Sequence, residues 1–564
     1  MTRTCVVLLG IAGLIACGPA PRRSGDQDGA TSAEPGCPVC ADDKAVLDCA
    51  GNVTTCPSDS VCSNGACANP CEVAEMNHSS VGCDYYAVDM DAAPGPPIDA
   101  CYAVFVANVS RGPVHVQFDW NGQSIDLSRF AKLPIGQGTT LTYGDYNPVT
   151  GLAPGQVAIV FLGYGFVIGN VACPVPAAIG ADAQIPGTGL SHAFHLTTDL
   201  PVVAYQMLPY GGGRAAATGA SLLIPTSAWG TNYIAVTGFE TPAPPLPLPT
   251  GPSLNIVAKE DGTVVTMRPR SAVLGGAGLP AGAENQPYTF TLARGQHAQI
   301  TQLAPLAGSP IEASKPVGVF GGHQVVSIDR CCGDHAEQML TPVRALGFEY
   351  VAAPHADRKP QPGEPRIYRI YGAVNGTALT YEPPNIGPAS VGLGGMLEIR
   401  SATPFVVRSQ DDQHPFSMFT YMSGAGATGE GGWGDADFVR LVPPTQFLSH
   451  YVFFTDPTYP FTWLTVVRHK HNGVFEPVTL DCAGTVSGWR PVGTSAEYEI
   501  TYVELVDHFH GVGQCNNGVR TMDSTGGFGV WVWGWGSEDT STGWVSYGYP
   551  AGESVLPINN VVIQ

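Results

Sequence analysis

The four residues 334–337 (Asp-His-Ala-Glu) form the densest group of chemically capable side chains in this sequence. An imidazole between two carboxylates can bind a metal ion or move protons to and from a substrate. The alternative is structural: Asp334 and His335 shape the turn after Cys331-Cys332, and Glu337 pairs within an interface between repeated units. Because the corresponding places in the other repeats are apolar or small, we favour the structural interpretation and expect no metal site here.

Two pairs of histidines have the spacing of side chains on one face of a strand. His508 and His510 follow Asp507, and His469 and His471 form the second pair. Histidines spaced in this way can bind zinc, but a zinc site needs at least a third protein ligand, and none can be assigned. We therefore interpret both pairs as surface or interface histidines.

Three carboxylates, Asp89, Asp91 and Asp99, flank a loop rich in proline and glycine at 94–97. Calcium prefers such groups of oxygen ligands, but the spacing matches no EF-hand or RTX motif. A solvated turn is therefore favoured over a calcium site, and the sequence predicts no cofactor.

Trp531, Trp533 and Trp535 alternate along a predicted strand and place three indoles on one face. Such a platform could stack on sugars, although a core or an interface between modules is favoured for rings of this size. The sequence contains no HExxH, GxSxG or Walker motif, so it indicates no metalloprotease, serine hydrolase or nucleotide hydrolase. We predict that the chain has no catalytic residue.

The cysteines indicate an oxidising compartment. Of the 16 cysteines, eight lie between Cys37 and Cys83, in a stretch with too few apolar residues for a core, so disulfides must replace one. Only 37–40 has the CxxC spacing that a zinc site would need. The other disulfide candidates are Cys101, Cys173, Cys331, Cys332, Cys482 and Cys515.

Two expectations concern how these candidates pair. Cys482 and Cys515 are the only cysteines of the last repeat, which predicts a bridge between them. The adjacent Cys331 and Cys332 either bridge each other or each pair with another cysteine, and disulfide geometry favours separate partners.

The N-terminus gives a reason for the oxidising compartment. Arg3 precedes an apolar run at 6–15 that is too short to span a bilayer and that ends in Leu-Ile-Ala-Cys17. This resembles a bacterial lipobox, and it predicts a signal peptide at 1–16 and a membrane anchor through diacylglycerol attached to Cys17. Gly18, where an inner-membrane protein would carry Asp, favours the outer membrane or cell surface. The alternative is an ordinary secretory signal with a chance cysteine, and either reading exports the chain.

Composition narrows the class of protein further. The net charge of −21 argues against nucleic acid as a partner, because a phosphate backbone needs a basic surface. The 564 residues include 70 Gly and 49 Pro, and only 13% are charged, which is typical of a chain with many turns. The 44% of hydrophobic residues are enough for real cores.

Alternating apolar runs separated by Gly, Pro, Asn and Asp predict an all-β chain from about residue 77 onward. Before it we expect a flexible tether at 17–36 and a Cys-rich disulfide segment at 37–76. Within 77–564, a pattern of Ser/Thr, spacer, proline and alternating apolar residues recurs. Each copy is followed by an apolar stretch, a second proline and a strand that starts with an aromatic residue. The predicted units begin near Tyr102, Tyr233, Tyr350 and Tyr451.

The length of these units indicates their architecture. Roughly 100 to 130 residues with six to eight short strands match about four tandem, antiparallel β-sandwich-like modules better than propeller blades of about 40 residues. A β-propeller-like arrangement of the repeats is the alternative. The proline of the first pattern predicts the start of an edge strand, where a missing N–H is tolerated.

Five segments of the sequence together resemble the motifs of one known protein family and occur in the same order. They are 79–91 (SSVGCDYYAVDMD), 201–206 (PVVAYQ), 220–233 (ASLLIP through WG to Y), 332–342 (CGDHAEQMLTP) and 547–552 (YGYPAG). Over about 77–564 they resemble the IgGFc-binding protein N-terminal domain family, although Gly333 is additional and Val545 stands where Asp is common. The resemblance implies a large extracellular β-rich binding domain. It does not imply antibody binding, because no Fc-contact residue can be carried over.

These observations predict a lipid-anchored cell-surface protein that binds or adheres and does not catalyse. Its expected partners are the membrane, through the lipidated N-terminus, and an extracellular protein or glycan. The alternative is a surface-anchored polysaccharide hydrolase, which needs two carboxylates about 5 to 10 Å apart in one cleft. A cleft with paired acids would favour the enzyme, and convex modules without one would favour the binding protein.

Overall fold

The structure is a computed structural model that describes residues 37–42, 44–57, 60–92, 99–166, 173–180, 183–212, 217–240, 250–358, 364 and 366–563. Cys17, the predicted signal peptide and the predicted tether lie outside the described residues. The described part of the chain is nearly all β and forms several antiparallel sheets, which confirms the predicted fold class. The chain divides into two compact units, 1–69 and 70–564.

The smaller unit is held together by disulfides. Its strands are β1 (Val39–Asp42), β2 (Ala45–Leu47), β3 (Val53–Thr55), β4 (Val61–Ser63) and β5 (Ala66–Ala68). Its bridges are Cys37–Cys49, Cys40–Cys62 and Cys56–Cys67. All residues of β1 and β3 are exposed, so crosslinks take the place of apolar burial, as expected for a segment of this composition.

The larger unit begins with α2 (Pro70–Asn77). Its strands follow in four consecutive groups at 82–222, 230–339, 349–440 and 448–550, which we call modules. The first consists of β6 (Gly82–Ala87), β7 (Asp99–Asn108), β8 (Val116–Trp120), β9 (Gln123–Ser124), α3 (Leu127–Phe130), β10 (Ala131–Ile135), η1 (Gly138–Thr140), β11 (Thr142–Asp145), β12 (Val157–Phe166), β14 (Phe194–Leu208) and β15 (Gly219–Leu222). The second follows η2 (Thr226–Ala228) and consists of β16 (Gly230–Ile234), β17 (Pro252–Ala258), β18 (Thr263–Met267), β19 (Tyr288–Leu292), β20 (Gln296–Thr301), β21 (Pro310–Ser327) and β22 (Gly333–Met339). β13 (Gly189–His192) lies between β12 and β14 in the sequence but pairs with β20 in the sheet of the second module.

The strands of the third module form three sheets, and those of the fourth form one. The third follows η3 (Val343–Ala345) and consists of β23 (Glu349–Val351), β24 (Ile367–Gly372), β25 (Thr377–Ala378), β26 (Thr380–Glu382), β27 (Ser390–Val391), β28 (Met396–Arg400), β29 (Val406–Arg408), β30 (Phe416–Met422), η4 (Ala425–Thr428) and β31 (Asp437–Arg440). The fourth follows η5 (Pro444–Gln446) and consists of β32 (Leu448–Thr455), β33 (Phe461–His469), β34 (Val478–Leu480), β35 (Gly484–Thr485), β36 (Arg490–Val492), β37 (Tyr498–Asp507), β38 (His510–Gly511), β39 (Gly518–Trp535), η6 (Glu538–Thr540) and β40 (Ser546–Pro550).

In the first two modules, one long strand changes its pairing partners along its length. β14 pairs through its first part with β6 and β8 and through its last part with β7 and β15, and its register with β6 shifts between Thr197 and Val202. Within β21 the pairing likewise passes from β18 to β17. Pro201 and Pro316 lie inside these two strands, at the change of partner. The predicted edge-strand start is therefore wrong for both prolines, because a missing N–H is tolerated wherever the ladder is already interrupted.

The second proline of each repeat begins a single 3-10 turn that leads into the next module. Pro225, Pro342 and Pro443 are the N-cap residues of η2, η3 and η5. The proline ring also packs on a glycine at the start of the preceding module. A Cβ at Gly230 would lie 2.5 Å from Cβ of Pro342, so only glycine allows this approach.

A buried tyrosine then fixes the first strand of each module. The Gly230 N–H donates to the Tyr233 hydroxyl (3.0 Å), and the Gly347 and Leu448 N–H groups donate to Tyr350 (3.1 Å) and Tyr451 (3.0 Å). In the first module the corresponding tyrosine is Tyr85 of β6, whose hydroxyl donates to the Val202 carbonyl at 2.7 Å. The repeated aromatic residue therefore serves to anchor a strand.

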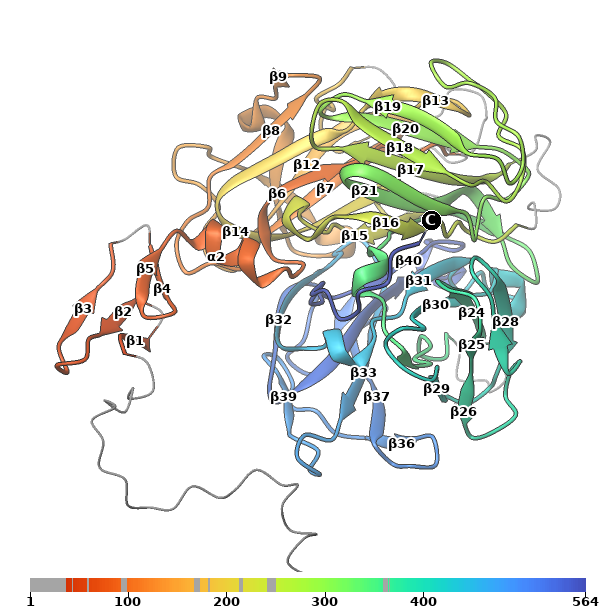
Figure 1. The fold of residues 1–564 in the computed structure, drawn as a ribbon. Coiled ribbons are helices and arrows are strands. Elements are labelled where there is room, and N and C mark those ends of the chain that lie inside the picture. Colours follow the sequence, from red (N-terminus) through yellow and green to blue (C-terminus); the bar gives the residue numbers. More distant parts are fainter. Residues whose placement is uncertain are drawn as a thin grey trace, which may run out of the picture. The chain divides into compact units, whose positions relative to one another are not determined.

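The last strands of the four modules meet at the centre of the larger unit. β15 lies against β22, β22 against β31, β31 against β40, and β40 against β15. Figure 1 shows β15, β31 and β40 at this centre. Each of the four strands also pairs with the strand that precedes it in its own module. The modules are thus arranged radially around a closed ring of strands, which we call the central ring.

Both ends of the larger unit close this arrangement. The Ser80 N–H donates to the Glu553 carbonyl (2.9 Å), and the Glu553 N–H donates to Ser80 Oγ (3.0 Å). The Val555 N–H donates to the His78 carbonyl at 2.6 Å. Glu553 also forms a buried ion pair with Arg440 of β31. The first and fourth modules are therefore joined through the two ends of this unit.

The remaining disulfides lie within the larger unit. They are Cys71–Cys83, Cys101–Cys173, Cys331–Cys332 and Cys482–Cys515. Cys482 and Cys515 are bonded to each other, with their Cα atoms 4.9 Å apart. Cys331 and Cys332 bridge each other and not separate partners, because every other cysteine of the described chain is already paired.

We expect the substitution Tyr451→Phe to lower the free energy of unfolding by about 1–3 kcal/mol, since it leaves buried polar backbone groups without their partner. The Tyr451 hydroxyl accepts from the Leu448 N–H and donates to the Phe528 carbonyl at 2.5 Å. Thermal unfolding followed by tryptophan fluorescence measures the effect. The control is Tyr502→Phe, a change at a half-buried tyrosine; an equal loss in both variants would contradict the anchoring role.

Candidate functional site

The Asp-His-Ala-Glu cluster lies in the central ring. Asp334, His335 and Glu337 are part of β22 and are 0% exposed. The predicted turn at Asp334 and His335 is therefore wrong, because pairing with β21 continues through Gly333. The interface role predicted for Glu337 agrees with the structure, since the Gln206 side chain of the first module donates to its carboxylate at 2.6 Å.

One residue from each module meets at Asp334. The Thr218 N–H of the first module donates to Asp334 Oδ1 (3.2 Å), and the Ser546 N–H of the fourth donates to Oδ2 (3.0 Å). The Ser546 hydroxyl lies 3.0 Å from the same Oδ2 and 2.9 Å from the carbonyl of Asp435 in the third module. We call these four residues the central junction.

Burial changes the protonation of the carboxyls around the central junction. It raises the pKa of Asp334 well above its ordinary value, and the nearby Asp435 raises it further. Burial also raises the pKa of Asp435 to about 7, although the Ala436 and Ala425 N–H groups oppose this by donating to its carboxylate. Burial raises the pKa of Glu337 and Asp437 as well. The ring thus favours neutral carboxylic acids, which need no counter-ion in a buried site.

This cluster is not placed to act on a substrate. A catalytic acid must come within hydrogen-bond reach of the group that it protonates, and all four carboxyls, with His335, are 0% exposed. In the described part of the chain, no group of three or more His, Cys, Asp or Glu side chains is arranged to bind a metal ion. The ring therefore works as a hydrogen-bonded joint between modules.

The other histidines and aspartates that the sequence singled out form no shared site among the described residues. His508 lies in a turn with φ 48°, so it and His510 do not share one strand face, and His508 bonds Asp507 at 2.6 Å. Asp91 is buried and accepts from the Gly187 N–H (2.8 Å) and the Gln324 side chain (3.0 Å), so it is not part of a solvated turn. The loop at 94–97 and the Asp99 side chain lie outside the described residues.

The three indoles of β39 are buried. Trp531, Trp533 and Trp535 are at most 1% exposed and pack with Tyr368 and Phe405 of the third module. They form the interface between the third and fourth modules, as favoured from the sequence. A sugar platform is excluded, because the ring faces are covered.

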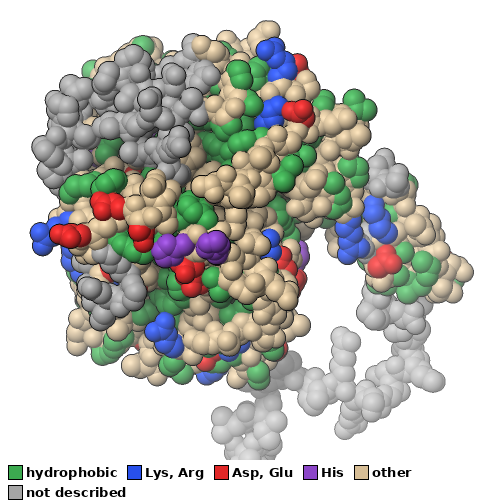
Figure 2. All heavy atoms as spheres, turned by 180° about the vertical axis from the view of Figure 1, so that it is seen from behind, with side chains coloured by type: hydrophobic (Ala, Val, Ile, Leu, Met, Phe, Trp, Pro, Cys, Tyr) green, Lys and Arg blue, Asp and Glu red, His purple; other side chains and the backbone are tan. Residues whose placement is uncertain are grey.

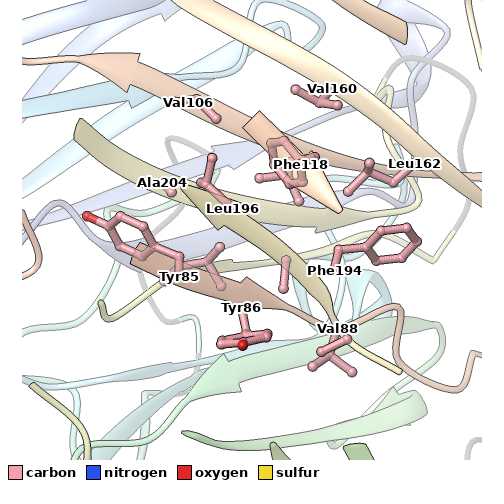
Figure 3. Packing of buried hydrophobic residues seen from close by; sticks show 14 of the residues in the cluster. Tyr85, Tyr86, Val88, Val106, Phe118, Val160, Leu162, Phe194, Leu196 and Ala204 are labelled. Carbon is pink, nitrogen blue, oxygen red and sulfur yellow. The ribbon is translucent and has the colours of Figure 1, made fainter. Parts of the chain in front are cut away.

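An accessible pocket of about 600 Å³ lies on the first module and reaches the β19–β20 turn of the second. Strand register builds it: in β14, His195 pairs with Tyr86 of β6 on one side and with Asp119 of β8 on the other. Because strand side chains alternate between faces, Phe194 and Leu196 point into the core, where they are 0% exposed. Figure 3 shows both among the labelled residues of this cluster.

His195 is held between two carboxylates. Its Nε2 lies 2.7 Å from Asp84 Oδ1 and its Nδ1 lies 3.0 Å from Asp119 Oδ2. Its ring stacks on Tyr86, with centroids 4.4 Å apart and planes at 15°. Burial alone would lower the pKa of His195, but the hydrogen bonds to Asp84 and Asp119 outweigh it and raise this pKa. Only a protonated imidazole donates to both acids at once, so the charged form organises the pocket.

Two turns complete the rim. Asn121 and Gly122 join β8 to β9 with φ angles of 49° and 71°, as in a two-residue hairpin of the Asn-Gly type. Arg294 of the β19–β20 turn lines the pocket, and the neighbouring Tyr86 hydroxyl raises the pKa of Arg294. The pocket is therefore built from turns on two modules over a rigid sheet.

The pocket does not have the acid–base pair of a glycosidase. Such an enzyme needs a carboxylic acid with a raised pKa that faces the substrate. Burial would raise the pKa of Asp84, but its hydrogen bond from His195 outweighs this and lowers it. The carboxyls with raised pKa values lie in the central ring, where they are 0% exposed to solvent.

Cys331 lines a second cavity, of about 610 Å³, with Phe239, Arg330 and Arg369. Arg369 stacks its guanidinium 3.7 Å from the centre of the Phe239 ring and bonds Glu240 and Glu398. The charge of Arg369 is thus already balanced within the protein.

Charged side chains are sparse on the face seen in Figure 2, and lysines and arginines there are interspersed with acidic side chains among polar and hydrophobic surface. A surface that binds nucleic acid instead gathers its basic residues in one patch or stripe.

Comparison with known protein families adds an independent finding. A family model described as IgGFc binding protein matches residues 219–534, from the start of β15 almost to the end of β39. The chain belongs to this family. Membership of the IgGFc binding protein family indicates an extracellular binding protein. A comparison with curated proteins finds no match to this chain. Within the described residues, no helix has the length and apolar character to cross a membrane.

The sequence alone does not identify the residues that form the pocket, nor Asp435 at the central ring. Asn121-Gly122 between two apolar runs is a hairpin signal that could have placed β8 and β9. Asp84 lies in a segment that resembles the family, but nothing in the sequence connects it with His195 or Asp119. Asp435 lies just before β31, and nothing in the sequence connects it with Asp334 of β22.

The acids of the central ring predict that stability falls as the pH rises. An unfolded aspartate has a pKa near 3.9, whereas Asp435 in the folded chain has a pKa of about 7. The stabilisation that this proton provides is complete below about pH 3.9 and is lost as the pH rises towards the folded-state value. We expect the melting temperature to fall between pH 4 and pH 8.

Asp435→Asn is the matched test, because an amide keeps an acceptor oxygen and cannot ionise. The variant should show a shallower fall than the wild type over the same range. Asp523→Asn, at an exposed aspartate, is the control. Identical pH profiles for Asp435→Asn and the wild type would refute the assignment.

Proposed function

We propose that this protein is an exported, lipid-anchored protein of the outer membrane or cell surface that binds an extracellular protein or glycan and does not catalyse a reaction. Membership of a family of binding proteins supports the binding role. The lipid anchor rests on Leu-Ile-Ala-Cys17, which lies outside the described residues.

The observation that carries the proposal is that the carboxyls with strongly raised pKa values are buried, whereas the accessible pocket contains none of them. The acids with strongly raised pKa values lie in the central ring and are 0% exposed. The accessible pocket instead holds His195 between two carboxylates, with the pKa of Asp84 lowered and that of His195 raised. A group held in one charge state by two partners positions a ligand well and transfers protons poorly.

The family's description names binding to the Fc region of IgG. For this chain an antibody is one protein ligand to be tested among others, since no Fc-contact residue can be identified in it. The modules offer a large extracellular surface, and fold alone does not name a ligand.

A combined glycan and protein array tests the binding role. We expect the full chain, purified in detergent micelles, to bind a defined subset of features with a dissociation constant that can be measured in solution. Hydrolysis of oligosaccharides by the same preparation, with no stable binding, would overturn the proposal in favour of the hydrolase.

Cys17→Ser tests the anchor. Because lipid attachment requires the cysteine thiol, the variant should appear in the aqueous phase or remain unprocessed, whereas the wild type should partition with membranes. Cys5→Ser, a cysteine inside the predicted signal peptide, is the matched control and should leave partitioning unchanged. Membrane association and mature size that do not differ between Cys17→Ser and wild type would exclude lipidation at this position.

A further inference from the structure

We propose that the pocket around His195 binds a carbohydrate without net charge, so that the extracellular ligand is recognised at least in part as a neutral glycan. This inference rests on the proposed binding function and names the ligand chemistry of one site. The pocket of about 600 Å³ lies within the range of 300–1,000 Å³ that is typical of small-molecule sites.

The charges of the pocket argue for a neutral ligand. Asp119, His195 and Arg294 line it. Asp119 and Asp84 both hydrogen-bond the protonated His195, and Asp84 does so without lining the pocket. An anion would meet Asp119, and a cation would meet His195 and Arg294. Neither sign of charge therefore gains from entering the pocket.

The hydrogen-bonding groups argue for a ligand with many hydroxyls. Gln117 and Ser124 are exposed on β8 and β9 and line the pocket together with Asn121 and Thr197. Amide and hydroxyl side chains each offer a donor and an acceptor. Sugar hydroxyls also donate and accept, so a polyol can satisfy these groups together, whereas a hydrophobic ligand would leave them without partners.

The pocket is organised before a ligand arrives. His195 is fixed by two carboxylates and by the Tyr86 ring beneath it, and the Thr226 hydroxyl holds Asp84 at 2.8 Å. The backbone of Arg294 is also held, since its N–H donates to Asp261 at 2.9 Å. Side chains that are already ordered lose little entropy on binding. This order suits a ligand such as a sugar, which binds through several directional hydrogen bonds and little apolar area.

The test uses the full chain and three sets of immobilised oligosaccharides of matched length: neutral, sulfated or sialylated, and amino-group-bearing. Unmodified proteins, including IgG, are printed on the same array. We expect the neutral set to bind best. Neutral hits are then titrated in solution against the wild type and the variants Asp119→Asn and Gln117→Ala.

Asp119→Asn should weaken neutral binding at least tenfold, because it removes one of the two carboxylates that orient His195. It should also shift the preference towards the anionic set, since the pocket then carries excess positive charge, and a merely structural loss would not produce this shift. Gln117→Ala, at an exposed position, should weaken binding without changing the preference or the melting temperature. Asp523→Asn is the matched control, because Asp523 pairs with His450 at 2.6 Å on the fourth module in the same type of His–Asp contact.

The outcomes separate this inference from the proposed function. Binding to proteins alone, or a best fit to charged oligosaccharides, overturns the neutral-glycan assignment and leaves the binding function standing. Neutral binding that is unchanged in both variants also overturns it, because the ligand then lies elsewhere. No binding to any feature removes both the inference and the proposed function.

Discussion

The shared hydrogen bonds of Asp334 are the constraint on which the rest of the structure depends. Its carboxyl accepts hydrogen bonds from the Thr218 N–H of the first module and from the N–H and hydroxyl of Ser546 in the fourth. The Ser546 hydroxyl also lies within hydrogen-bond distance of the Asp435 carbonyl in the third module. A buried polar group without a partner costs roughly 1–3 kcal/mol, so each of these bonds favours keeping two modules together. Together the bonds of the junction connect all four modules at the place where β15, β22, β31 and β40 pack against one another.

This constraint explains where chemistry is absent and where recognition remains possible. Acids that would be reactive at a surface are neutralised by burial in the ring, so their role is to join modules. The outer faces carry no such requirement, and there the register of β6, β8 and β14 places His195 between Tyr86 and Asp119. Membership of the IgGFc binding protein family fits this division, since a scaffold fixed at its centre can vary its outer loops and turns without loss of the fold.

Much of the architecture could be predicted, and the failures have physical causes. The all-β class and the repeated Pro-to-Tyr pattern follow from local signals, because turn residues and alternating apolar residues act over a few positions. The roles of Pro201 and Pro316 were mistaken, because a proline within a long strand and one at an edge look alike in a single sequence. The vicinal bridge of Cys331 and Cys332 was not favoured, because pairing depends on which other cysteines are already in reach of one another.

The sequence by itself determined the properties that depend on composition and short spacing. These are the β-rich modules, the crosslinked first unit, the burial of the β39 tryptophans at an interface and the resemblance to a binding family. Tertiary structure alone decided which side chains meet. His195 and Asp119 are 76 residues apart, and Asp334 and Ser546 are 212 apart, so their contacts come from strand register and from closure of the ring. No local pattern contains that information, because it arises only when the four modules pack against one another.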